Sequence, residues 1–149
     1  MGVSVNAQLC IGILFPDDYV LPWDEVGKNL DDWWRDVRGY VPMFYPFDGG
    51  GNYKPGLEYG SPEVEAYFAE KRKWGEENPL PVELVPFGSD ESYLLAVVGT
   101  LQTAYSGFPE EVRIPEMSEV RDATVKLLEF CQEFGLEGTP RWYLSSYMG

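Results

Sequence analysis

Hydrophobic and polar residues alternate along the first strand-length segment of the chain. Val3, Val5, Ala7, Leu9, Ile11, Ile13 and Phe15 occupy every second position, and Pro16 follows them. A period of two is typical of a β-strand with one buried face. Shorter apolar runs predict further strands at residues 82–87, 93–104 and 141–147.

A second pattern, with hydrophobic residues three or four positions apart, predicts three helices. The first covers residues 26–37, between Asp24 at its N-cap and Gly39 after its end. The others cover residues 61–75 and 118–135, where serines begin the helices and glycines end them. The apolar stripes, which we expect to be buried, contain Trp33 in the first helix, Val64, Tyr67, Phe68 and Trp74 in the second, and Leu127 and Cys131 in the third.

The order of these elements predicts a ferredoxin-like fold. Taking the first two helices as one crossover gives βαββαβ, a four-stranded sheet with helices on one face. Residues 1–16 and 92–109 contain no charged side chain. Central parallel strands are buried and read as apolar runs, so we expect the first and third strands to be adjacent and parallel. The sequence therefore predicts one α+β domain covering residues 1–149.

Residues 40–60 follow neither period. They contain three prolines, the triplet Gly49-Gly50-Gly51 and six Phe or Tyr side chains. A long irregular segment inside a compact domain is often functional. The glycines are similar to a phosphate-binding loop, but Lys54 is followed by Pro55 rather than by a hydroxyl residue. We expect a turn between aromatic anchors.

Charge indicates the kind of partner. The chain has 149 residues, of which 25 are acidic and 11 basic, so its net charge is −14. Hydrophobic residues make up 44%, enough for a folded core. Such a surface repels nucleic acid and anionic membranes and attracts basic partners. No apolar stretch approaches the ~20 residues of a membrane span, and no basic secretory start is present, so we expect a cytoplasmic protein (in the host, if the chain is viral).

The residue types present exclude most catalytic machinery. The chain has no histidine, so Ser-His-Asp and Cys-His catalysis and histidine-based zinc sites are excluded. Cys10 and Cys131 are too isolated for structural zinc, and we expect them to be reduced. The pairs Asp17-Asp18 and Asp31-Asp32 have no calcium-loop spacing and are interpreted as solvated surface. We expect no enzyme activity, no cofactor and no metal.

Two acidic segments are the candidate partner-binding residues. Residues 17–36 combine seven carboxylates with three tryptophans, and Trp34 lies about 100° round the helix from Trp33, so we expect it to be partly exposed. Residues 110–137 hold eight carboxylates. An exposed aromatic side chain among carboxylates is typical of a hot spot for an Arg-rich surface. The candidates are Asp24, Glu25, Asp31, Asp32, Trp34, Asp36, Phe44, Tyr45, Phe47, Asp48, Tyr53, Glu119, Asp122, Glu129 and Glu133.

The leading hypothesis is an interaction protein that occupies a basic site on another protein. In its most concrete form the carboxylates imitate a phosphate backbone and inhibit a nucleic-acid-binding protein or complex, as small phage counter-defence proteins do. One alternative is a ferredoxin-like domain that binds a small molecule or divalent metal under residues 40–60, including a homodimer joined through sheet faces or edges. A second alternative is an enzyme that uses carboxylates, Tyr or Lys.

Overall fold

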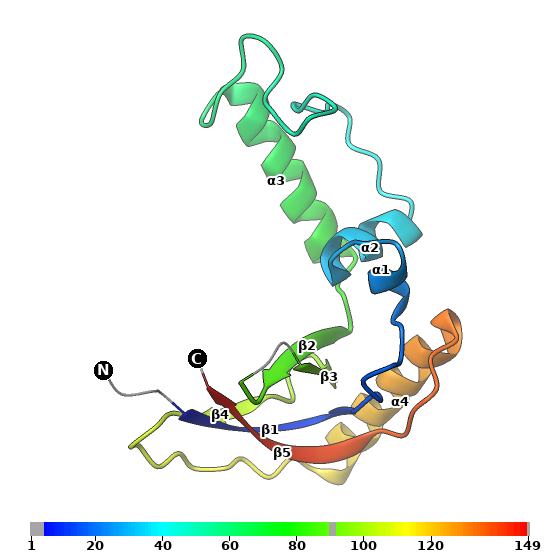
Figure 1. The fold of residues 1–149 in the computed structure, drawn as a ribbon, viewed down its shortest axis with the longest axis vertical. Helices are drawn as coiled ribbons and strands as arrows, with labels where there is room; N and C mark the ends of the chain where they lie inside the picture. Colours follow the sequence, from blue (N-terminus) through cyan, green and yellow to red (C-terminus); the bar gives the residue numbers. More distant parts are fainter. Residues whose placement is uncertain (1–4, 90–91, 149) are drawn as a thin grey trace. The chain divides into compact units, whose positions relative to one another are not determined.

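The computed structural model describes residues 5–89 and 92–148, and it has a mixed α+β fold (Figure 1). The chain divides into two compact units, Met1–Lys28 with Pro81–Gly149, and Asn29–Leu80. We call them the sheet unit and the helical unit. The expectation of a single domain stays a prediction. The sequence Gly88-Ser89-Asp90-Glu91 also predicts a turn after the strand at residues 82–87. Gly88 and Ser89 are described, whereas Asp90 and Glu91 lie outside the described residues.

In the described residues, the sheet unit contains five strands, which pair antiparallel. They are β1 (Val5–Ile13), β2 (Val82–Phe87), β3 (Ser92–Val97), β4 (Gln102–Ala104) and β5 (Arg141–Met148). β1 is central: β5 pairs along one of its edges, β3 and β4 share the other, and β2 pairs with β3. The strands predicted at residues 82–87 and 141–147 are confirmed.

The predicted ferredoxin-like topology is wrong in its strand order and direction. β1 and β3 are neighbours, as expected, but they are antiparallel, with Gly12 opposite Ala96. A lack of charge identifies strands that are buried, and either pairing direction buries them equally well. The sheet has five strands rather than four because the predicted strand at residues 93–104 is divided.

The side chain of Thr100 replaces a backbone hydrogen bond of the sheet where the predicted strand is divided into β3 and β4. Two residues of β1, Cys10 and Ile11, lie opposite five residues, 97–101, so the register shifts by three positions between β3 and β4. The Thr100 hydroxyl accepts the Ile11 N–H at 3.2 Å and donates to the Val97 carbonyl at 2.8 Å. The buried amide of Ile11 is therefore satisfied although its strand partner loops away.

The sheet curls until β5 meets the end of β2. The Gly88 N–H donates to the Ser146 carbonyl at 2.7 Å, and the Met148 N–H donates to the Gly88 carbonyl at 3.1 Å. An apolar cluster inside the curl holds Cys10, Val85, Leu94 and Ala96, with Phe87, Leu101 and Tyr143 packed against them.

Helix α4 (Met117–Phe134) packs against β1 and β3. It buries Ala123, Leu127, Phe130 and Cys131, so the predicted burial of Cys131 is confirmed. It begins one residue before Ser118, with Glu116 at the N-cap, and ends at Gly135, which has a left-handed φ of 69° as expected.

The first predicted helix is two helices. A short helix, α1 (Pro22–Glu25), belongs to the sheet unit, and α2 (Leu30–Val37) belongs to the helical unit. Gly27, with φ of 68°, lies between them, so the helix predicted over 26–37 begins at Leu30. The predicted Asp24 cap is wrong: Asn29 caps α2 by accepting the Asp32 N–H at 2.8 Å.

The third helix of the chain, α3 (Pro62–Glu77), continues through Gly75, where it was predicted to end. A glycine with ordinary helical φ weakens a helix without breaking it, because its cost is only about 1 kcal/mol. Of its predicted buried stripe, Val64 and Tyr67 are buried, whereas Phe68 is 37% exposed.

Candidate partner-binding surfaces

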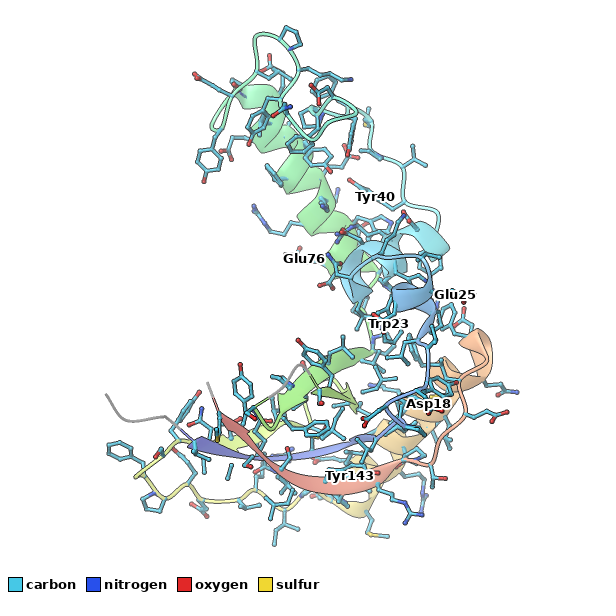
Figure 2. The ribbon with its side chains drawn as sticks, viewed as in Figure 1. Asp18, Trp23, Glu25, Tyr40, Glu76 and Tyr143 are labelled. Carbon is cyan, nitrogen blue, oxygen red and sulfur yellow. The ribbon has the colours of Figure 1, made fainter. Side chains whose placement is uncertain are left out.

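The aromatic segment of the helical unit packs onto α3. Phe47 and Tyr53 form an antiparallel bridge with stacked rings, their centroids 5.2 Å apart. The rings of Tyr45 and Phe47 approach Tyr67 of α3 edge-on, at 6.0 and 5.8 Å. Figure 2 shows Tyr40, which stacks obliquely on Trp74 at 5.2 Å. Three of the predicted aromatic candidates therefore belong to one cluster, in which Tyr45 stays exposed and Phe47 and Tyr53 are half-buried. The fourth, Phe44, is exposed, and the Lys54 ammonium lies 5.6 Å from its ring centre.

Asp48 is used within its own turn. Its carboxylate accepts the N–H groups of Gly50 at 2.8 Å and Asn52 at 3.0 Å, and its own N–H donates to the Asn52 carbonyl at 2.7 Å. The amides that a phosphate loop would offer to a ligand are thus bonded to a carboxylate. The glycine triplet forms the turn between aromatic anchors that its sequence predicts.

The expectation that Trp34 is partly exposed is wrong. It is 7% exposed, its Nε1 donates to the Asn78 carbonyl at 3.0 Å, and the Arg38 guanidinium lies 4.2 Å from its ring centre. Helical spacing alone does not reveal this burial, because the hydrogen-bond partner of Trp34 is Asn78, which follows α3 and is distant in sequence. Trp34 is therefore a packing residue of the helical unit.

The acidic candidates near the N-terminus are divided between the two units. Asp24 and Glu25 lie exposed on α1 in the sheet unit, whereas Asp31, Asp32 and Asp36 lie on α2 in the helical unit. Asp31 and Asp36 are exposed. Asp32 accepts the Asn29 side-chain amide at 2.9 Å and pairs with Arg35, so it serves the helix start. Among the described residues no acidic residue is fully buried, although Asp32, Glu70 and Glu83 are half-buried. Figure 2 labels three exposed acidic residues, Asp18, Glu25 and Glu76.

One flank of α4 carries a line of exposed charges, which we call the acidic stripe: Glu119, Asp122, Glu129 and Glu133. With Lys126 between them, they follow spacings of three, four, three and four, so they share one flank of the helix. At 1.5 Å per residue the stripe is about 21 Å long. Glu119 accepts a hydrogen bond from the Arg113 guanidinium at 2.8 Å.

An apolar trough beside this stripe was not predicted. Leu9 lies opposite Leu144, and Ile11 lies opposite Trp142, so all four share one sheet face. Val112 and Ile114, in the segment that joins β4 to α4, flank that face. Trp142 is 42% exposed, Leu144 79% and Ile114 88%. We define the trough by Leu9, Val112, Ile114, Trp142 and Leu144.

Charged side chains line both ends of the trough. A hollow of about 300 Å³ at one end is lined by Ile11 and Trp142 together with Glu119 and Asp122. A hollow of about 320 Å³ at the other end is lined by Leu9 and Leu144 together with Glu110 and Glu111. Arg113 and Lys126 also line the first hollow. The trough thus brings two of the predicted acidic residues next to exposed apolar area, and leaves Glu129 and Glu133 further along α4.

Gln102 fixes the segment that borders the trough. Its side-chain amide donates to the Arg113 carbonyl at 2.9 Å and accepts the Arg113 N–H at 2.8 Å, which imitates a strand pair. The sequence signal that could have found the trough is the uncharged, partly apolar run that follows Arg141. This run predicts a strand, but the pattern does not show which face of the strand is covered.

The cysteines have the properties of packed side chains. Burial, and secondly the charge of Glu83, raises the pKa of Cys10 to about 11, and burial raises the pKa of Cys131. Burial also raises the pKa of Glu83. Both cysteines are free of disulfides. Among residues 5–89 and 92–148, no three Cys, Asp or Glu side chains form a group that could hold a metal ion.

No protein-family model, curated protein or solved structure matches this chain. Within the described part of the chain, no helix is long and apolar enough to cross a membrane.

Proposed function

We propose that this chain is a non-enzymatic interaction protein that binds a basic partner protein through the acidic stripe of α4 and the apolar trough beside it. One observation carries the proposal: the hollow that contains Ile11 and Trp142 has a charged rim, in which Glu119 and Asp122 of the acidic stripe lie beside Arg113 and Lys126. Apolar area with a charged margin is the anatomy of a protein interface, in which the centre supplies affinity and the margin steers association.

The remaining carboxylates support a role in long-range attraction. A net charge of −14 on exposed side chains attracts cationic surfaces, and its effect on association weakens as salt rises. Carboxylates with fixed local tasks, such as Asp32 and Asp48, contribute little to a reactive site, because their oxygens already accept bonds from neighbouring groups. This favours an interaction protein over the carboxylate-dependent enzyme.

The finer proposal is that the partner is a nucleic-acid-binding protein. The acidic stripe places negative charge along about 21 Å of a rigid helix. A cationic groove that follows a phosphate backbone is complementary to such a line. The chain would then exclude nucleic acid from the groove and act as an inhibitor.

Competition with DNA tests both the binding of a basic partner and the exclusion of nucleic acid from that partner. A labelled duplex is bound to each member of a panel of basic nucleic-acid-binding proteins, and the chain is added at physiological ionic strength. We expect displacement from at least one member and no binding to lysozyme, a basic protein that lacks a nucleic-acid groove. Binding to a panel member without displacement contradicts the mimic and leaves the interaction protein; no binding to any basic protein contradicts both.

A further inference from the structure

The outer edge of β5 presents peptide groups without a strand partner. The Ser146 carbonyl and the Met148 N–H point away from β1, because both bond to Gly88. Peptide groups alternate in direction along an antiparallel strand, so those of Trp142 and Leu144 point to the same outer edge. In the described residues only Gly88 pairs with this edge, at its far end. The stretch around Leu144 is open.

The other edges of the sheet carry protection that β5 lacks. β2 contains Pro86, which has no N–H, and the charged Glu83, while β4 is only three residues long. Short edges, prolines and charges are how proteins prevent unwanted strand pairing. β5 has eight residues, no proline, and no charge after Arg141. The part of this edge that Gly88 leaves open, residues 141–145, is suited to pairing with another strand.

We propose that β5 is the interface of a symmetric homodimer, in which the β5 strands of two copies pair antiparallel about Tyr143. In this register, Trp142 lies opposite Leu144 of the second copy, and Leu144 lies opposite its Trp142. Their outward peptide groups form four hydrogen bonds, and their exposed side chains form two apolar pairs. A twofold interface of this kind needs only one self-complementary patch.

Charge selects a second copy rather than the basic partner of the proposed function. The carboxylates near Trp142 and Leu144 line the hollows over the sheet face and do not belong to β5, so a basic strand would find no carboxylate on the strand itself. Two copies of β5 bring no like charges opposite each other, since Arg141 faces Ser145. The acidic stripe lies on α4, so the net charge of each copy is carried elsewhere. The pairing uses Trp142 and Leu144, which also belong to the trough of the proposed function, so a dimer covers part of that surface. Sedimentation tests the dimer and competition with DNA tests the basic partner, so the two proposals fail in different experiments.

Proline substitution separates edge pairing from folding. Leu144→Pro removes an N–H that points away from β1, so the β1–β5 ladder through Tyr143 and Ser145 is kept. Leu144→Ala keeps that N–H and loses only side-chain area. Leu144→Lys is the second variant, because a lysine on an exposed edge opposes pairing without restricting the backbone.

Sedimentation equilibrium measures the outcome, with circular dichroism to verify folding. At about 100 µM, enough to populate a dimer with a Kd in the micromolar range, we expect the wild type at twice its 16.9 kDa. We expect Leu144→Ala to be a weakened dimer and both Leu144→Pro and Leu144→Lys to be monomers. Slow hydrogen exchange of the Leu144 amide in the wild type, lost in Leu144→Lys, identifies the paired edge. A monomeric wild type, or a dimer that persists in Leu144→Lys or leaves the Leu144 amide unprotected, overturns the proposal.

Discussion

Replacing Thr100 by valine should destabilise the sheet unit, because it removes the hydroxyl that joins β1 to the divided strand. Valine has nearly the same shape, so the change deletes two hydrogen bonds without leaving a cavity. The Val97 carbonyl still accepts the Thr100 N–H at 3.2 Å. The Ile11 N–H loses its acceptor, and Ile11 is 3% exposed, so water cannot easily replace it.

The expected loss follows from the cost of a buried, unsatisfied donor. That cost is about 1–3 kcal/mol, which for a chain of this size lowers Tm by roughly 2–4 °C per kcal/mol. Urea denaturation followed by circular dichroism measures the difference. The matched control is Thr124→Val, whose hydroxyl donates to the Val120 carbonyl within α4, and which should change stability by less than about 0.5 kcal/mol. Equal effects of the two variants would refute the role assigned to Thr100.

Three further variants and one chemical test examine the packing. Gly12→Ala should destabilise by about 1–3 kcal/mol, because its Cβ would lie 2.7 Å from the Leu95 carbonyl oxygen; a neutral result in thermal denaturation would contradict the close strand packing. Gly75→Ala should stabilise by about 0.5–1 kcal/mol, since nothing lies within 4 Å of the new Cβ on α3; destabilisation would contradict its helical conformation. Glu83→Gln should stabilise the protein at pH 7 and have little effect near pH 4. Burial raises the pKa of Glu83, so the native state disfavours the charged carboxylate and the stability of the wild type falls as pH rises through that pKa. An effect of the substitution that does not depend on pH would contradict this. Cys10, with its pKa raised to about 11, should react with a thiol reagent at pH 8 only after denaturation, and rapid native labelling would contradict its burial.

Much of the sheet could be predicted from the sequence because its signals are local. Alternation identifies β1, and the uncharged segments identify the strands that meet at its centre. Strand direction could not be predicted, because both directions bury the same side chains. The division of the strand at Thr100 could not be predicted either. A hydroxyl that replaces a backbone hydrogen bond of the sheet leaves the apolar pattern of residues 93–104 unchanged.

The candidate surface was predicted in part. The exposure of Glu119, Asp122, Glu129 and Glu133 follows from helical spacing, and the structure agrees. Trp34 was misplaced because its cover comes from Asn78, distant in sequence. The trough was missed for the same reason: whether Leu144 is covered depends on where residues 110–115 run, and that is a tertiary property.

Two charge-matched quadruple variants test the central claim most directly. One reverses the acidic stripe by changing Glu119, Asp122, Glu129 and Glu133 to lysine. The other changes Asp17, Asp18, Glu58 and Glu76 to lysine. These four residues are exposed and lie outside the stripe. Both raise the net charge equally, so a nonspecific electrostatic attraction would weaken equally in both.

The measurement is the affinity of each variant for a basic protein that the wild type binds, at physiological ionic strength. We predict that the stripe variant loses at least about tenfold, or 1.4 kcal/mol, more affinity than the control variant. Equal losses in the two variants would mean that net charge alone attracts the partner, and would contradict a binding surface on α4.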